Sequence, residues 1–162
     1  WIALLCGAHY DMIDFSIQPF LEEGTSRVQS HLRSWFRHLS AYVHSLDLAR
    51  SRPLPELLRS APPDTVAVIF GLPDADYSVY VADAREYPGI RALDTEEGDR
   101  GAGEPISGTI VIDLPDTTIA VSTFEPTTGI EAEREPVRGG SGTRVELEPF
   151  HHDIVIRLSI EP

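Results

Sequence analysis

The chain opens on an uninterrupted apolar run, residues 1–6, that stops at Gly7. No polar position alternates within this run, which is typical of a strand buried on both faces of a parallel sheet. Hydrophobic periodicity alone does not distinguish such a strand from a segment of buried helix. We predict a β-strand here, and we expect Cys6 to be a buried apolar residue of that strand.

A helix is predicted over residues 26–48. Ser26 followed by Gln29 fits a capping box at its start. The residues that recur at three- and four-residue steps form one apolar stripe, expected in the core: Val28, Leu32, Trp35, Phe36, Leu39, Val43 and Leu46. His31 and His38 lie near the edge of this stripe, and we expect them to pack or to face solvent rather than to bind a ligand.

The second part of the chain is predicted to be all β. Short runs rich in Val, Ile, Thr and Tyr occupy residues 65–70, 77–82, 108–114, 117–124, 143–148 and 153–160. Turn-forming Pro, Gly and Asp residues separate these runs, and no helical pattern intervenes. Many short strands of this kind predict an antiparallel β-sandwich, for which roughly 100 residues suffice.

The charge balance of the sequence changes at the same place as its hydrophobic pattern. The sequence has 26 acidic residues and 13 basic ones, with a formal net charge of −13. Residues 1–60 are neutral overall, so residues 61–162 carry the whole excess. The Pro-rich stretch 52–63 lies at this boundary and is predicted to be a linker. We therefore predict two units, residues 1–60 and 61–162, with a long loop over 85–105.

Composition excludes several classes of protein. The acidic balance disfavours a nucleic-acid partner, because such binding needs a basic face. No apolar run approaches the roughly 18 residues of a membrane span, so no membrane partner is expected. A single cysteine cannot form an internal disulfide. The sequence contains no phosphate-binding Gly loop, no zinc-protease motif and no Gly-x-Ser-x-Gly elbow, so we expect no cofactor and no metal.

One strand and one helix cannot close a hydrophobic core. A doubly buried strand needs parallel neighbours for its backbone groups, and an amphipathic helix needs a sheet to cover. The sequence also begins with Trp1 rather than Met. We therefore expect the chain to be the C-terminal piece of a longer α/β protein. If it folds alone, its first unit is expected to be exposed or rearranged.

The order of elements and three short motifs carry a family resemblance. The apolar run and a His9-Tyr10 loop precede the helix and the β-unit. Within that unit, residues 77–82 are Tyr-rich, residues 124–129 read Phe-Glu-Pro-Thr-Thr-Gly, and a Pro-Phe-His-His-Asp motif leads into the last strand. This pattern resembles the C-terminal part of bacterial glycoside-hydrolase-like proteins. They carry a (β/α)8 barrel followed by a small β-sandwich, sometimes labelled a collagen-binding domain.

The resemblance implies an α+β chain, in which the last strand and helix of a barrel precede the sandwich. Active sites of such barrels lie on the loops that follow the strands. His9, Tyr10, Asp11 and Asp14 would then border a cleft for an oligo- or polysaccharide. The same residues also fit a polar loop that satisfies its own backbone. Because the carboxylate pair of a glycosidase is expected on earlier strands, the chain alone is predicted to be inactive.

Other candidate residues have plainer interpretations. His151 and His152 precede the last strand, and neighbours in a strand point to opposite faces, so we expect a surface pair rather than metal ligands. Glu96, Glu97 and Asp99 lack EF-hand spacing and are expected in a solvated loop. Two hypotheses on function stay open: the β-sandwich is a non-catalytic accessory domain that packs on the barrel, or it is a module that binds carbohydrate or protein.

Overall fold

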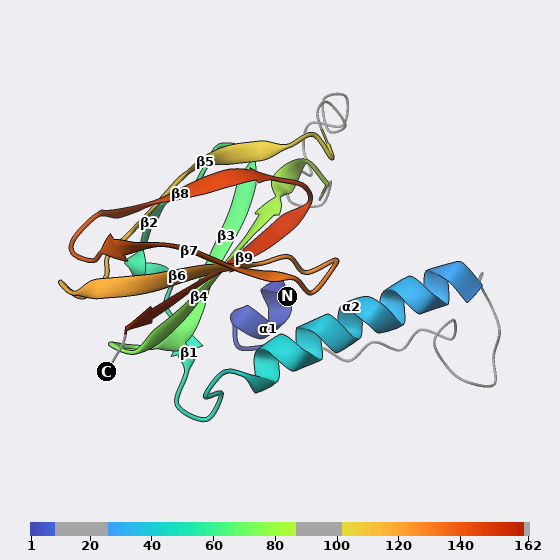
Figure 1. Ribbon diagram of the computed structural model, residues 1–162, viewed down its shortest axis with the longest axis horizontal. Helices are drawn as coiled ribbons and strands as arrows, with labels where there is room; N and C mark the ends of the chain where they lie inside the picture. The colour runs from blue at the N-terminus through green and yellow to red at the C-terminus, as the bar shows by residue number, and fades with distance from the viewer. Residues whose placement is uncertain (9–25, 87–101, 161–162) are drawn as a thin grey trace.

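The computed structural model describes residues 1–8, 26–86 and 102–160, which form mostly antiparallel β-sheet (Figure 1). The larger sheet has six strands in the spatial order β1 (Arg52–Pro53), β3 (Thr65–Leu72), β4 (Asp76–Asp83), β9 (Asp153–Ile160), β6 (Thr118–Phe124) and β7 (Glu131–Arg138). The smaller sheet has the order β2 (Leu58–Ser60), β5 (Ile106–Ile112) and β8 (Thr143–Phe150). Within these residues every strand pair is antiparallel. The prediction of an antiparallel, β-rich second unit is confirmed.

Helices complete the fold. They are α1 (Ile2–Leu5), α2 (Ser26–His44) and two short 3-10 helices, η2 (Pro55–Leu57) and η3 (Ala84–Glu86). Helix α2 begins at the predicted residue and ends at His44, before the predicted end at residue 48. At its end the Ser45 hydroxyl donates a hydrogen bond to the carbonyl of Tyr42 over 2.7 Å. The same carbonyl also accepts from the backbone N–H of Ser45 over 2.9 Å, in a tightened last turn of the kind that is common at helix ends.

The main core lies between the two sheets. Alternate residues of each strand point into it, as the two-residue period of a strand requires. The larger sheet contributes Val79 and Val81 from β4, and the smaller sheet contributes Ile110 from β5; all three are fully buried. The register that pairs Val79 with Ile156 of β9 brings the inward residues of neighbouring strands side by side. The predicted alternation in these strands therefore forms the sandwich core.

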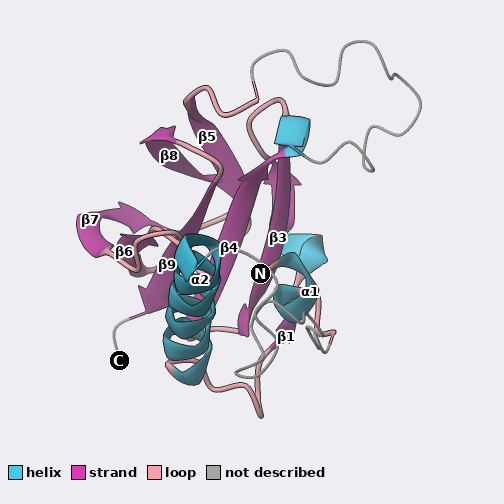
Figure 2. Cartoon of the chain, turned by 90° about the vertical axis from the view of Figure 1, so that its right-hand side faces the viewer, coloured by secondary structure: helices cyan, strands magenta, loops and turns pink. Residues whose placement is uncertain are grey.

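A second core covers the outer face of the larger sheet. Tyr80 and Phe70 point outward from β4 and β3, where they meet Tyr42 of α2 and Leu5 of α1. Each of these four side chains is at most 6% exposed. Figure 2 shows both helices beside the strands of this sheet and away from β5 and β8. The described part of the molecule thus has three layers: the small sheet, the large sheet and the helices.

The N-terminal half of α2 extends past the sheets (Figure 1). Leu46, just past the end of the helix, packs on the sheet as the apolar stripe predicts. Tyr42, which the predicted stripe did not include, packs there as well. Trp35, predicted in the core, is instead 43% exposed, and Phe36 is only half-buried. The stripe is longer than the surface available to cover it, and its first half has little sheet beneath it.

The predicted N-terminal strand is wrong, because residues 2–5 form helix α1. Its backbone groups pair within the segment, with Cys6 N–H donating to the carbonyl of Ile2 over 2.9 Å. A helix needs no parallel neighbour, and the described residues contain no parallel sheet that could supply one. Helical geometry turns Leu5 toward the sheet and leaves Cys6 exposed, which also corrects the prediction of a buried thiol. A barrel strand is therefore not present at this position.

The Pro-rich stretch predicted as a linker belongs to both sheets. Strand β1 pairs with β3, and β2 pairs with β5. Leu54 between them is 1% exposed in the main core. Pro53 is tolerated because β1 lies at the edge of its sheet, where a proline breaks no ladder of hydrogen bonds. The division into two units at residue 60 stays a prediction, and most of the predicted loop, residues 87–101, lies outside the described residues.

Two polar contacts fix α2 against the β-strands. Arg157 of β9 donates from Nη1 to Ser45 Oγ over 3.0 Å, while its guanidinium also pairs with Asp76 of β4 over 2.8 Å. Farther along the helix, the Nδ1–H of His38 donates to the carbonyl of Pro126 over 3.1 Å. His38 thus contacts the turn between β6 and β7, so of the two expected alternatives, packing or facing solvent, this histidine packs.

Replacing Gly129 by Ala is expected to loosen this contact. Gly129 has a φ of +74°, and an added Cβ would lie 2.7 Å from the His38 ring. The matched control is Gly142→Ala, where φ is +71° and the added Cβ meets its nearest atom at 3.7 Å. We expect the free energy of unfolding to fall by about 1 kcal/mol in the control and by about 1–2 kcal/mol more in Gly129→Ala. Denaturant unfolding of both variants measures the difference; equal losses would show that the His38 ring yields freely.

Candidate functional site

The site predicted from the sequence lies outside the described residues. It consists of His9, Tyr10, Asp11 and Asp14, all within residues 9–25. Its role toward a substrate stays a prediction. The described residues instead bring polar and aromatic groups together at one end of the sandwich, where β4, β8 and β9 end or begin. Two arrangements occur there: a hydrogen-bonded network and a pocket.

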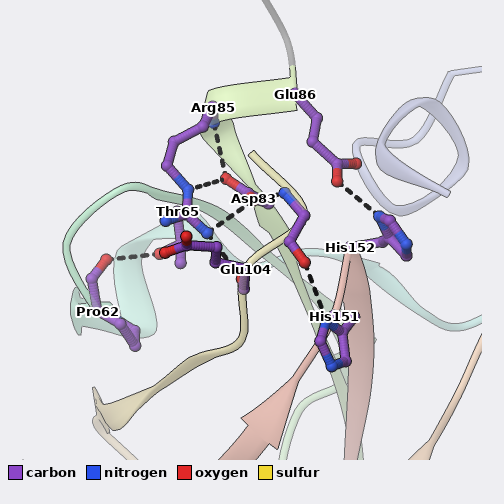
Figure 3. A network of polar contacts seen from close by, with 9 residues as sticks. Pro62, Thr65, Asp83, Arg85, Glu86, Glu104, His151 and His152 are labelled. Atoms are coloured by element: carbon purple, nitrogen blue, oxygen red, sulfur yellow. Dashed lines mark hydrogen bonds and ion pairs between the residues drawn. The ribbon is translucent and has the colours of Figure 1, made fainter. Parts of the chain in front are cut away.

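The network centres on Asp83, the last residue of β4 (Figure 3). Arg85 donates to both carboxylate oxygens of Asp83, from Nε over 2.8 Å and from Nη2 over 2.9 Å. The backbone N–H groups of Arg85 and Gly103 donate to the same carboxylate. Burial alone would raise the pKa of Asp83, but these hydrogen bonds outweigh it and hold the pKa below its ordinary value. The aspartate is therefore ionised and fully buried.

Arg85 and Gly103 lie on either side of residues 87–101. The Nη2 of Arg85 also donates to the carbonyl of Glu104 over 2.9 Å. The Nδ1–H of His151 donates to the carbonyl of Gly103 over 3.0 Å. Figure 3 shows these bonds joining η3, residues 102–104 and the turn between β8 and β9. The network thus fastens both flanks of the segment to the end of the sandwich.

The two adjacent histidines turn to different partners. His151 contacts Gly103, whereas the Nδ1 of His152 lies 2.6 Å from Oε1 of Glu86. Both rings are exposed, with centroids 6.3 Å apart, and they occupy a turn in which His152 has a φ of +61° rather than the predicted strand geometry. In the part of the chain that the structure describes, no group of three His, Cys, Asp or Glu residues could hold a metal ion.

A pocket of about 360 Å³ opens beside this network. Its walls come from the N-terminus, α2, η3 and the turns after β6 and β8. The residues that line it are Trp1, Trp35, Glu86, Pro126, Thr127, His152 and Asp153. They combine two indole rings with two carboxylates, a hydroxyl group and an imidazole. Such a set offers aromatic faces and hydrogen-bond acceptors to a ligand.

Aromatic packing holds one wall of the pocket. The Trp1 ring is stacked on Tyr80, with centroids 6.0 Å apart and an interplanar angle of 5°. It also meets Tyr42 edge-on at 5.2 Å and Phe124 at 5.7 Å. Because three rings contact it, Trp1 is placed before any ligand arrives. Among the described residues, Trp35 on α2 has one ring contact, with His31 at 6.1 Å, and it is the more exposed of the two indoles.

Of the two pocket carboxylates, Asp153 lies in the less hydrated surroundings. Tyr80 donates to Asp153 Oδ2 over 2.9 Å. Burial raises the pKa of Asp153, and the hydrogen bond from Tyr80 lowers it by less. The other carboxylate, Glu86, is 29% exposed and accepts from His152 when that ring carries the proton on Nδ1. The pocket therefore places one poorly hydrated carboxylate and one partly hydrated carboxylate beside indole rings.

A second, more open hollow of about 710 Å³ lies on the outer face of the large sheet. Its floor is formed by small residues of β6 and β9, such as Ala120 and Ser159, and its rim by Glu131 and Arg134 of β7. Ser122 donates to Glu131 over 2.7 Å, and Arg134 pairs with Glu148 over 2.6 Å. Since Glu131 and Arg134 already bind neighbouring side chains, this hollow is the weaker candidate.

Sequence reasoning missed the pocket. Glu86 and Asp153 are far apart in sequence, and no spacing motif links them to Trp1. Trp35 was assigned to the core because its place in the apolar stripe does not reveal where the sheet ends. Four residues of its lining, Pro126, Thr127, His152 and Asp153, belong to motifs noted in the sequence, but nothing in the sequence indicated that these motifs meet. The structure describes no helix that is both long and apolar enough to cross a membrane.

Comparisons with known proteins bear on the fold. No protein-family model matches the chain, and no curated protein matches it. Among solved structures, it is similar to a glycoside hydrolase family 5 protein from Bacteroides vulgatus ATCC 8482, with a TM-score of 0.52 and 10% identity over 77% of this chain and 23% of that one. It is also similar to a chain described as a glycoside hydrolase, with a TM-score of 0.57 and 8% identity over 88% of this chain and 30% of that one. The chain thus spans under a third of either protein, and what it shares with each is a fold.

Proposed function

We propose that this chain is the C-terminal part of a glycoside hydrolase, and that its β-sandwich is a non-catalytic accessory domain packed on the catalytic barrel. The likeness in fold to parts of two much longer glycoside hydrolase chains supports this assignment. The substrate class of the parent protein is then an oligo- or polysaccharide. Its acid and nucleophile or base belong to earlier strands, so the chain itself catalyses no hydrolysis.

The observation that carries the proposal is an apolar side of α2 that the described residues leave partly exposed. Trp35 is 43% exposed, and Leu32, Phe36 and Leu39 are half-buried. We name these four residues the α2 docking face. This face begins in the N-terminal half of α2, which extends beyond the sheets (Figure 1), and continues past the middle of the helix. A contiguous apolar face of this kind marks a protein interface, and in the proposal the catalytic barrel covers it.

The reading frame upstream of Trp1 tests the parentage directly. It is expected to continue for roughly 250–300 residues with alternating strand and helix patterns, the length of a (β/α)8 barrel. That upstream part, produced separately, is expected to bind the present chain in isothermal titration calorimetry. A stop codon immediately before Trp1, or a barrel that does not bind the chain, would contradict the proposal.

The α2 docking face is expected to make the isolated chain self-associate. Trp35→Glu introduces a charge into the face and is expected to lower the association constant at least about tenfold. Leu48→Glu is the matched control, because Leu48 is 48% exposed but lies beyond the end of α2. Sedimentation equilibrium measures both. If the unaltered chain stays monomeric, or if the two variants behave alike, the face is not an interface.

The second candidate function is a carbohydrate-binding module. The indole rings of Trp1 and Trp35 in one pocket favour it, since the faces of pyranose rings pack on aromatic side chains. Affinity electrophoresis of the whole chain in gels that contain neutral polysaccharides separates the two candidates. Unchanged mobility is expected for an accessory domain, whereas clear retardation would identify a binding module.

A further inference from the structure

The pocket that Trp1 and Trp35 line is acidic. Its described lining includes the carboxylates of Glu86 and Asp153 but no guanidinium group, and the chain contains no Lys. Among the described side chains, the positive group that acts on Asp153 is the His152 imidazole, when it is protonated. With both acids ionised, the side chains of the pocket are negative overall even when His152 is protonated.

Of the two pocket carboxylates, Asp153 is the one whose ionised form a bound cation would stabilise more. Burial has already removed part of its hydration, and this raises its pKa despite the hydrogen bond from Tyr80. A hydroxyl group could donate a hydrogen bond to this carboxylate, but it would leave the negative charge uncompensated in poorly hydrated surroundings. Any ammonium group would neutralise the charge, and one that carries N–H groups, such as that of an amino sugar or a lysine side chain, would also donate hydrogen bonds.

The indoles favour the same chemistry. The face of a Trp ring attracts an organic cation through its quadrupole, more strongly than Tyr or Phe does. Contacts with Tyr80, Tyr42 and Phe124 hold the Trp1 ring in place. An aromatic wall that is already ordered loses little conformational entropy when a ligand binds.

We propose that this pocket binds a small organic cation through its alkylammonium group, with the charge beside Asp153 and Glu86 and the alkyl part against the indoles. The ammonium group could belong to a choline-like compound, an amino sugar or a lysine side chain. The pocket shares Trp35 with the α2 docking face, but the cation site rests mainly on Asp153, Glu86 and Trp1. Binding of a cation by the isolated chain therefore tests this site whether or not a barrel covers the α2 docking face.

Intrinsic fluorescence can test the site, because both tryptophans of the chain line the pocket. Two matched pairs isolate the charge: choline against its neutral carbon isostere 3,3-dimethylbutanol, and glucosamine against glucose. Nα-acetyllysine amide represents the peptide source. Titrations are made in dilute protein, below the range of self-association. At least one cation is expected to bind about tenfold more tightly than its neutral counterpart, and added salt is expected to weaken it.

Asp153→Asn is expected to reduce the affinity for that cation about tenfold. Glu86→Gln, on a different element, provides a second test if the first variant folds poorly, and it is expected to act in the same direction. Asp116→Asn removes an exposed carboxylate outside the pocket and is expected to leave the affinity unchanged. Equal binding of glucose and glucosamine would identify a neutral-sugar site and overturn the proposal. No response to any probe, or equal losses in all three variants, would also overturn it.

Discussion

Asp83→Ala is expected to lower the free energy of unfolding by about 3 kcal/mol. The carboxylate of Asp83 is fully buried, and Arg85, 13% exposed, donates to both of its oxygens. Its removal would leave the Arg85 guanidinium largely unpaired and would deprive the Gly103 N–H of its acceptor. The loss exceeds that of an ordinary ion pair because little water can reach the groups left behind. Denaturant unfolding gives the value.

Asp116→Ala is the matched control for this variant. Asp116 also pairs with an arginine, Arg138, over 2.7 Å, but the two side chains are 79% and 67% exposed. Water solvates both partners after the pair is broken, so the free energy of unfolding is expected to stay within about 0.5 kcal/mol. Similar losses in the two variants would mean that the Asp83 network is no stronger than a surface pair.

The Asp83 network also predicts a pH dependence. Hydrogen bonds hold the pKa of Asp83 below its ordinary value in the folded chain, despite the opposing effect of burial. The ionised form therefore stabilises the fold above the ordinary aspartate pKa of about 3.9. That contribution is lost as the pH falls further, through the lowered pKa of the folded state. Asp83→Ala is expected to flatten the acid side of the stability profile, and an unchanged slope would contradict this.

The β-strands with a buried face were predictable because their side chains alternate. Ile110 and Ile112 of β5 face the core, as do Val145 and Leu147 of β8. Each of these two strands has one face toward the core and one toward solvent, so hydrophobic and polar residues alternate along its sequence. The antiparallel fold of the second unit follows from several such strands in succession.

Strand β7 carried no such signal. Its sequence is Glu-Ala-Glu-Arg-Glu-Pro-Val-Arg, and it lies at the edge of the large sheet with most side chains exposed. Backbone pairing with β6, rather than side-chain burial, defines this strand. Charged residues and proline are typical of edge strands because they discourage pairing with other chains. A hydrophobic pattern cannot reveal a strand of this kind.

The prediction of a strand for the apolar N-terminal run was wrong for a different reason. Six apolar residues fit a short buried helix as well as a buried strand, and only the neighbours decide between them. Here Leu5 finds its partners on the outer face of the large sheet, beside Tyr42. The pocket was equally hidden, since its walls meet only when α2, η3 and two turns are packed together. Local pattern thus predicted elements but not the surfaces on which they meet.

Tyr42→Ala is expected to cost about 4 kcal/mol, the largest effect among these variants. Tyr42 is 4% exposed and joins α2 to the large sheet, where its ring meets Phe124 at 4.9 Å and Trp1 at 5.2 Å. Its hydroxyl group is 2.9 Å from the buried Ser78 Oγ. Truncation would leave a cavity and also remove the main contact of the helix, so hydrogen exchange in α2 is expected to accelerate together with the loss of stability.

Tyr42→Phe separates the hydroxyl group from the ring. It keeps the aromatic packing and is expected to cost only about 1 kcal/mol, the value of the lost hydrogen bond to Ser78. Burial raises the pKa of Tyr42 to about 12, more than the bond to Ser78 lowers it. Stability is therefore lost as the pH rises from the ordinary tyrosine pKa of about 10 toward that value, since the unfolded chain ionises first. When the folded chain is titrated with base, the phenolate absorbance that appears at the highest pH is expected to be missing in Tyr42→Phe. If that absorbance persists, it does not arise from Tyr42. If Tyr42→Ala leaves hydrogen exchange in α2 unchanged, the helix is not held by this residue.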